Sequence, residues 1–290
     1  MIIKSIVIEI IKTILCFFRI NEYSFEKFPD RDINNGKKCI VMGNGPSLKS
    51  LLNDYENGIA KIDDDCFVVN FFPLNPLFYR LKPKYLFWSD YVFIQDTEGS
   101  TEKVRKMYDE MQEKVDWDLT IYLNAPWKKD NKRLIAYSKL TNPHIRFVSL
   151  NRNYCDNLCP QIRHRLYKSG YFMPTEGTVV NTAIYVALLQ GFKEIELYGS
   201  ELSMFKDLEV GDDNQLYIVQ KHFYEKDYKV KQTTDGGGKA YVHTYMYYMY
   251  AMFYSHYLLE EFSKYMDAHI INCTPNSMID VYDRKNDFKS

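Results

Sequence analysis

The chain has 290 residues, enough for one large domain or two small ones. Lys and Arg number 37 and Asp and Glu 38, so the net charge of −1 excludes the strong basic field typical of nucleic-acid binding. The six cysteines show no metal-ligand spacing, which indicates a reducing compartment without a disulfide framework or a cysteine metal site.

Residues 1–20 form an apolar segment that is interrupted by charges. These charges share one half of a helical wheel: Lys4, Glu9, Lys12 and Arg19. The pattern favours an amphipathic helix in the plane of a membrane over a spanning one, with packing on protein as the alternative. Residues 21–36 lack periodicity and are expected to be a linker, which leaves 37–290 as the main domain.

The first strand signal, over 39–42, leads directly into a glycine turn and a helix start. The turn consists of Gly43, Asn44, Gly45, Pro46 and Ser47. Strand, glycine turn and helix start form a geometry that receives phosphate, because glycines let the backbone approach and unpaired N–H groups face the anion. The turn lacks the ending of a P-loop, and Leu48 replaces the third glycine of a dinucleotide fingerprint, which disfavours NAD. An ordinary tight turn is the alternative.

Polar residues also follow the next two strand signals. The second strand ends at Asn70, and the third ends at Ser89 and Asp90. In a parallel sheet the ligand lies at the carboxyl ends of the strands, so these side chains are candidate nucleotide-binding residues. The acidic run 63–65 precedes its strand, whereas a metal-dependent glycosyltransferase places such acids after one, so a solvated turn is expected there.

The second half of the chain repeats the pattern of strand ends and helix starts. Thr175, Glu176 and Gly177 open an almost wholly apolar helix and form a second anion-ready helix start. The following strand ends in Gly199, Ser200 and Glu201.

Three further stretches stand out between and after these elements. A basic cluster in 151–172 suits either an acidic substrate or a solvated face. Residues 202–242 have the composition of a lid over the strand ends. The Tyr and Met residues of the helix expected over 244–266 are predicted to be core.

These motifs resemble the bacterial sialyltransferases of glycosyltransferase family 42, and more loosely the DUF115/Maf group of nonulosonic-acid transferases. The resemblance rests on four pieces in the family's order, within roughly 37–280: residues 43–49, the helix after Glu176 and Gly177 with the strand that follows it, residues 199–201, and residues 273–277. It implies an α/β fold, namely a Rossmann-like GT-A variant with a mostly parallel sheet flanked by helices and a lid subdomain at about 202–242.

The resemblance also implies a substrate and its binding residues. The donor would be a CMP-activated nonulosonic acid, used without a cofactor or a required metal. The implied contacts to the nucleotide are Asn44, Asn70, Ser89 or Asp90, and Thr175 to Gly177. The family's acid after the strand-end glycine is Asp, whereas this chain has Glu201, which leaves the exact donor and acceptor open.

The family's general base is a histidine between the lid and the penultimate helix, and His243 matches that place. His222 is the rival base. The family also has two lid tyrosines that bind the leaving phosphate. Ser203 stands near the first of those positions, so Tyr217 or Tyr224 would have to bind the leaving phosphate from a different place in the chain.

The resulting expectation is an inverting, metal-independent transferase acting on a glycan or glycolipid acceptor such as lipooligosaccharide or capsule. It would work in the bacterial cytoplasm, peripherally on the inner face of the cytoplasmic membrane, without nucleic acid and with a homo-oligomer as a further expectation. Two alternatives remain: a pterin pyrophosphokinase-like enzyme, which shares the Gly-x-Gly-Pro-Ser-Leu turn, and a non-enzymatic nucleotide-binding protein.

Overall fold

The computed structural model describes residues 11, 14, 27–93, 101–124, 128–220, 228–232 and 238–285. The expected amphipathic helix over 1–20 therefore lies outside the described residues, apart from residues 11 and 14. His222 and Tyr224 fall in 221–227, which is also outside them.

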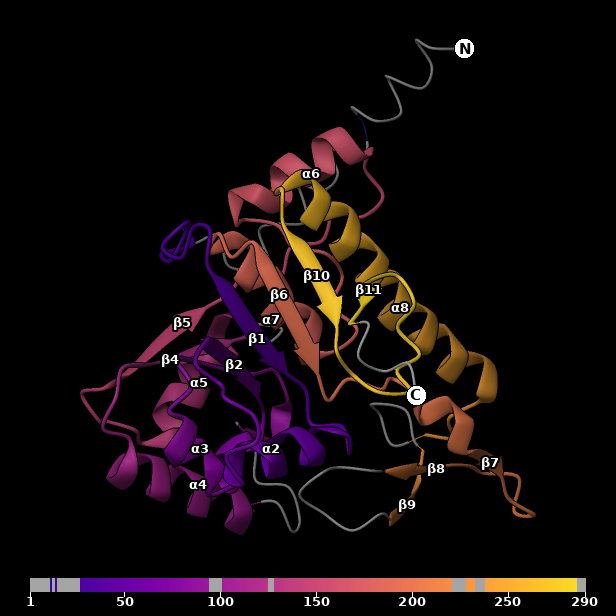
Figure 1. The fold of residues 1–290 in the computed structure, drawn as a ribbon. Coiled ribbons are helices and arrows are strands. Elements are labelled where there is room, and N and C mark those ends of the chain that lie inside the picture. The colour runs from indigo at the N-terminus through magenta and orange to yellow at the C-terminus, as the bar shows by residue number, and fades with distance from the viewer. Residues whose placement is uncertain are drawn as a thin grey trace.

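The fold is built on one eight-stranded sheet in which all neighbouring strands are parallel (Figure 1). The strands in sheet order are β11 (Asp283–Arg284), β10 (His269–Asn272), β6 (Glu194–Tyr198), β1 (Lys38–Met42), β2 (Asp65–Val69), β3 (Tyr85–Trp88), β4 (Leu119–Leu123) and β5 (Ile145–Ser149). The central strands are continuous apolar runs because helices bury both of their faces. The expected mostly parallel, Rossmann-like α/β arrangement is confirmed.

Helices pack on the two faces of the sheet with separate hydrophobic clusters. One cluster includes α6 (Pro160–Ser169), α7 (Val179–Leu189) and α8 (Val242–Tyr265). The other includes α2 (Leu48–Glu56), α3 (Leu77–Leu81), α4 (Thr101–Lys114) and α5 (Lys128–Ser138). The 3-10 turns are η2 (Phe72–Leu74), η3 (Tyr91–Phe93) and η4 (Met204–Asp207). Alternate residues of each central strand point to opposite clusters, so each strand contributes side chains to the hydrophobic packing on both faces of the sheet.

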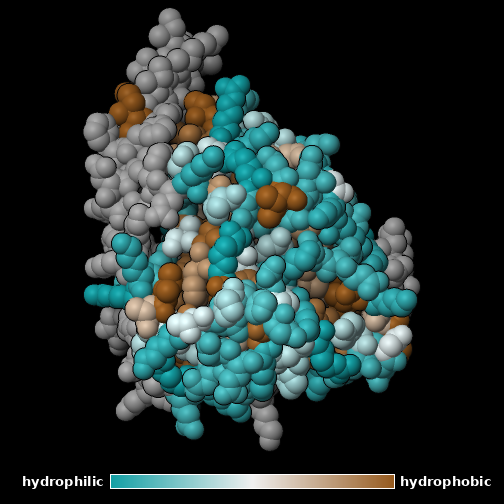
Figure 2. Space-filling model, turned by 90° about the vertical axis from the view of Figure 1, so that its left-hand side faces the viewer, coloured by the Kyte–Doolittle hydropathy of each residue, from teal (hydrophilic) through white to brown (hydrophobic). Residues whose placement is uncertain are grey.

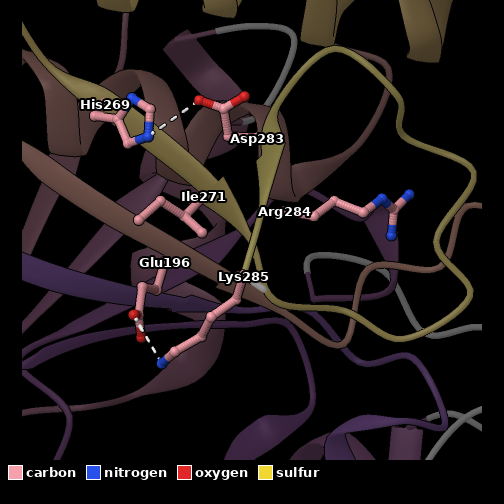
Figure 3. Close-up of a pocket in the computed structure, with 6 residues that line it drawn as sticks. All are labelled: Glu196, His269, Ile271, Asp283, Arg284 and Lys285. Atoms are coloured by element: carbon pink, nitrogen blue, oxygen red, sulfur yellow. Dashed lines mark hydrogen bonds and ion pairs between the residues drawn. The ribbon is translucent and has the colours of Figure 1, made fainter. Parts of the chain in front are cut away.

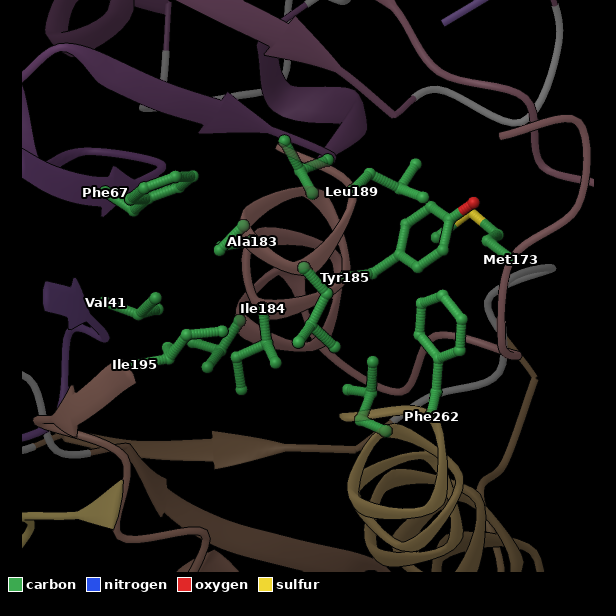
Figure 4. Packing of buried hydrophobic residues seen from close by; sticks show 14 of the residues in the cluster. Val41, Phe67, Met173, Ala183, Ile184, Tyr185, Leu189, Ile195 and Phe262 are labelled. Carbon is green, nitrogen blue, oxygen red and sulfur yellow. The ribbon is translucent and has the colours of Figure 1, made fainter. Parts of the chain in front are cut away.

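The helix α7 lies at the centre of the first cluster. Figure 4 shows it between sheet residues such as Val41 and Phe67 on one side and Phe262 of α8 on the other. Ten of its residues are buried, since it contacts protein on almost every side. Burying each large aliphatic side chain stabilises the fold by about 1.5–3 kcal/mol, so this packing holds the N-terminal end of α7 in a defined place.

The segment expected to form a lid contains a small antiparallel sheet. Its strands are β7 (Leu208–Val210), β8 (Leu216–Gln220) and β9 (Tyr228–Lys231), in that order. In Figure 1 this sheet lies on the side of the molecule toward which β1, β6 and β10 point.

Residues 27–36 do not behave as the expected linker. Phe28, Asp30 and Asn34 are buried, and Arg146 donates two hydrogen bonds to the Asp30 carboxylate at 2.9 and 2.7 Å. The packed domain therefore begins before the expected boundary at residue 37, because this polar stretch carries the partners of buried groups in the sheet.

The prediction that the tyrosines of α8 are core is wrong for several of them. Met249 is buried and Met252 packs against the core, but Tyr247, Tyr250 and Tyr257 are exposed. The α8 helix therefore buries one face and presents aromatic rings on another.

The described residues include no helix that is long and apolar enough to cross a membrane. The face of the molecule in Figure 2 is mainly hydrophilic, with hydrophobic residues in small separate groups.

Buried His256 should make the stability of the fold depend on pH. Its Nδ1 lies 2.9 Å from the Tyr282 hydroxyl, and burial lowers the pKa of the ring to about 3. In the unfolded chain the His256 ring binds a proton near pH 6.5, whereas in the folded chain it stays neutral. The stability that the neutral ring contributes is therefore complete above pH 6.5 and is lost as the pH falls toward 3. The expected loss is about 1.4 kcal/mol of unfolding free energy per pH unit in that window.

Urea unfolding of the wild type and His256→Asn between pH 7.5 and 4.5 tests this expectation. The wild-type unfolding free energy should fall more steeply than that of the variant. Equal slopes would show that His256 is not kept neutral by burial.

Candidate functional site

The strand order reverses between β1 and β6. The chain passes from β1 through β2, β3 and β4 to β5, and then returns to place β6 on the other side of β1. Ligands of open parallel sheets bind outside the carboxyl ends of the strands at this switch point. Figure 1 shows the N-terminal end of α8 and the small sheet on this same side.

The turns that follow β1 and β6 are packed directly against each other. Gly43 N donates to Tyr198 O and Gly45 N donates to Gly199 O, both at 2.8 Å. A Cβ atom on Gly43 would lie 2.3 Å from Gly199 O, and one on Gly45 would lie 1.6 Å from Glu201 Oε2. Both positions therefore require glycine, because the turn after β6 lies where a Cβ atom of the turn after β1 would be.

The first helix start is occupied by the chain's own carboxylate. Ser47 N donates to Glu201 Oε1 at 2.7 Å, which places a negative charge at the N-terminus of α2. This position is favourable for the helix dipole. The sequence suggests a phosphate here, but in the structure Glu201 holds the position. Pro46 is exposed in the same turn.

Polar side chains from three strand ends form a connected rim beside this turn. Asn44 Nδ2 donates to Val69 O at 3.2 Å, at the end of β2, and Asn70 Nδ2 donates to Asp90 Oδ2 at 2.8 Å. Ser89 precedes Asp90 and is half-buried. The structure thus brings together the predicted residues at the ends of β1, β2 and β3.

Several polar atoms of this rim are buried without a partner in the described part of the chain. They are Asn44 Oδ1, Asn70 Oδ1 and Ser47 Oγ. Buried polar atoms nearly always have a hydrogen-bond partner, which can be water or a ligand. The rim therefore holds two buried amide oxygens whose capacity to accept hydrogen bonds is unused within the described part of the chain.

Glu176 is directed into the protein. Its Oε1 accepts from the Tyr154 hydroxyl at 2.8 Å and pairs with Arg152, while Asn124 Nδ2 donates to Oε2 at 2.7 Å. Burial raises the pKa of Glu176, and Arg152 opposes that rise. This side chain, predicted to bind nucleotide, instead ties the end of β4 to the start of α7. Arg152, part of the predicted basic cluster, is thereby used in an ion pair.

Asn124 is a strand-end residue that the sequence analysis missed. It follows β4, is fully buried, and its Oδ1 has no partner among the described residues. The available signal was a polar residue directly after a strand, the same signal that identified Asn44 and Asn70.

The second helix start is capped from within. Thr178 and Asn181 form a reciprocal cap at the start of α7, and Thr175 N donates to Asp156 Oδ2 at 3.1 Å. A Cβ atom on Gly177 would lie 2.3 Å from Met252 Cα, so this glycine allows α8 to approach. Val180 lies 3.4 Å from the Cβ position of Gly43, which places the start of α7 beside the β1 turn.

The loop after β10 is hydrogen-bonded to the turn that follows β6. Ser200 N donates to Thr274 Oγ1 at 3.2 Å, Ser277 Oγ donates to Ser200 O at 2.8 Å, and Met278 N donates to Glu201 O at 2.8 Å. Residues 273–277 therefore position Ser200 and Glu201 rather than forming a separate site.

The predicted catalytic side chains lie on other elements. His243 is exposed in the first turn of α8, where its ring stacks on Tyr241 at 5.7 Å. Tyr217 in β8 donates its hydroxyl to Asp213 at 2.7 Å, and this hydrogen bond raises the pKa of Tyr217. His243 and Tyr217 therefore lie on α8 and β8, and not on the turns that form the rim.

A cavity of about 610 Å³ lies elsewhere, against β6, β10 and β11 (Figure 3). Its charged groups are paired: Lys285 with Glu196 at 3.2 Å and His269 with Asp283 at 3.4 Å. Arg284 donates to Ser277 O at 2.7 Å. This cavity is lined by residues of β6, β10 and β11 and by Lys285 after β11, whereas the rim is built from the turns that follow β1, β2 and β3.

No protein-family model and no curated protein matches the chain.

Proposed function

We propose that the chain is an inverting glycosyltransferase of the GT-A kind that moves a sialic-acid-like sugar from a CMP-activated donor to a hydroxyl of a cell-surface glycan. The observation that carries the proposal is the rim at the β1/β6 switch point, where Asn44 bonds the end of β2 and Asn70 bonds Asp90, and where the oxygens of both amides have no partner among the described residues. The resemblance of the turn motifs to family 42 supports the choice of donor.

The rim suits the nucleoside half of the donor better than its phosphate. Once these buried side chains turn toward a ligand, ribose hydroxyls and an exocyclic amine can donate to the oxygens of Asn44 and Asn70, which have no partner among the described residues. A phosphate at the start of α2 would meet the carboxylate of Glu201, which is already bound to Ser47 N. We therefore place the nucleoside at the rim and the sugar phosphate toward α8 and the small sheet, which would act as the lid.

His243 is the proposed general base. Transfer requires the acceptor hydroxyl to lose its proton as it attacks, and the pKa of histidine suits this near neutral pH. The ring is accessible to an acceptor arriving from solvent. Attack from the face opposite the departing phosphate inverts the anomeric centre. His222 remains the rival base.

The acceptor class implies a place of work at the inner face of the cytoplasmic membrane. The one-sided charges of residues 1–20 support this placement.

A thermal-shift panel of CMP, UDP, GDP, ADP and ATP tests the nucleotide assignment. CMP should raise the melting temperature most, because a ligand at 100 times its Kd stabilises by about 2.7 kcal/mol. In Asn44→Ala the Kd for CMP, measured by calorimetry, should rise about tenfold, which equals about 1.4 kcal/mol. The matched control is Asn53→Ala, an exposed asparagine on α2, which should bind CMP as the wild type does.

Preferential stabilisation by ATP would favour the pyrophosphokinase alternative. CMP binding that is equal in the wild type and Asn44→Ala would place the nucleotide away from this rim.

A further inference from the structure

The outer face of α8 carries a row of tyrosines, Tyr247, Tyr250, Tyr254 and Tyr257, which we call the tyrosine seam. Tyr247, Tyr250 and Tyr257 are 66%, 59% and 48% exposed. The Tyr250 and Tyr254 rings stack at 5.5 Å and 8°, and the Tyr254 and Tyr257 rings at 6.0 Å and 12°. The rings of Tyr250, Tyr254 and Tyr257 therefore form one nearly parallel stack along the helix.

The spacing of the seam is that of a helix-packing surface. Its residues follow one another at intervals of three, four and three, and His243 and Glu261 extend the alternation by four at each end. An average spacing of about 3.5 residues keeps side chains facing a second helix, as in coiled coils. Exposed aromatic side chains that gather in one row are typical of interfaces.

The opposite face of α8 already has its partners within the chain. Met249, Leu259 and Phe262 are buried in the cluster shared with α7. The seam therefore lies on the face of α8 that is turned away from α7.

We propose that the seam pairs antiparallel with the seam of a second copy of this chain. The intervals read the same in both directions about a point level with Met252. A two-fold axis at that level places Tyr250 opposite Tyr254 and Tyr247 opposite Tyr257, and such self-complementary contacts define isologous dimers. This inference shares His243 with the proposed catalytic site, so it is tested by mass and crosslinking and not by activity.

The residues at the two ends of the seam, His243 and Glu261, favour antiparallel over parallel pairing of the helices. The same axis places His243 opposite Glu261. Glu261 Oε2 accepts from Arg163 at 2.6 Å, while its Oε1 has no partner in the described part of the chain and can accept from the imidazole. A parallel pair would set Glu261 against its own copy, and it would align the two helix dipoles unfavourably.

Light scattering coupled to size-exclusion chromatography tests the dimer. The full-length wild type should have twice the mass of one chain. Tyr250→Lys should raise the dimer dissociation constant at least tenfold by placing two buried lysines near the axis. The matched control is Tyr248→Lys, since Tyr248 is 55% exposed but lies about 100° round the helix from Tyr247. Circular dichroism confirms that both variants fold.

Crosslinking with a short bis-maleimide tests the orientation independently of those variants. Tyr247→Cys and Tyr257→Cys should crosslink when the two proteins are mixed, with mass spectrometry locating the linked peptides. Tyr247→Cys alone should not link to itself, because antiparallel pairing separates the two copies of residue 247 by about 15 Å.

A monomeric wild type, or a Tyr250→Lys variant that dimerises as well as the Tyr248→Lys control, would overturn the proposal. A Tyr247→Cys self-link would overturn the antiparallel arrangement. A monomer whose binding to anionic vesicles is weakened by Tyr250→Lys would assign the seam to a membrane surface instead.

Discussion

His243→Ala is expected to lower the turnover number by roughly 10² to 10⁴, the usual contribution of a positioned acid or base. The imidazole would accept the proton of the acceptor hydroxyl, so its removal affects the chemical step. CMP binding should change little, because the nucleoside is assigned to Asn44 and Asn70 and not to α8. The measurement is CMP release from a panel of CMP-sugars with galactose-terminated acceptors, run beside a CMP titration.

The matched control is His269→Ala, an exposed histidine at the start of β10 whose loss should leave turnover unchanged. His222→Ala should have a smaller effect than His243→Ala. Activity that survives in His243→Ala but disappears in His222→Ala would reverse the assignment. Joint loss of activity and CMP binding would indicate a structural role for His243. Because His243 also lies at the end of the tyrosine seam, the mass of the variant should be measured in the same preparation.

Gly43→Ala is expected to destabilise the fold by about 3 kcal/mol, at the upper end of the usual cost of overpacking. The new Cβ would lie 2.3 Å from Gly199 O, a backbone atom that accepts from Gly45 N just past the end of the parallel ladder between β1 and β6. Relief therefore requires the two strand ends to separate. The same movement would displace Asn44, so CMP binding should weaken as well. Urea unfolding gives the free energy and calorimetry gives the affinity.

Gly58→Ala is the matched control. Gly58 has a φ of +70° but no atom within 4 Å of its Cβ position, so the substitution should cost only backbone strain, about 1 kcal/mol. A Gly43→Ala variant as stable as Gly58→Ala would show that the packed turns relax without cost.

The strand ends were predictable because their signal is local. A short apolar run followed by a polar residue marks a buried parallel strand and the place where it leaves the core. This reasoning identified Asn44, which the structure bonds to Val69 O at the end of β2, and Asn70 and Asp90, which bond each other at the same edge of the sheet. It applied equally to Asn124, whose position after β4 carries the same signal.

Local sequence signals could not predict which group accepts hydrogen bonds at the N-termini of α2 and α7. A glycine turn before a helix looks the same whether a phosphate or a carboxylate accepts from its N–H groups. Here the acceptor for Ser47 N is Glu201, which is 154 positions away in the chain. Glu176 likewise meets Arg152 and Asn124 only because α7 is packed against the end of β4.

The sequence by itself therefore determined the parallel sheet, the strand ends and the two glycine-rich turns, since each depends on residues close together in the chain. Only the tertiary structure decided which polar groups are already paired, because those partners come from distant segments. It also decided that several tyrosines of α8, among them Tyr247, Tyr250 and Tyr257, lie outside the core. Their spacing suits either face of a helix, and the buried face is set by contact with α7.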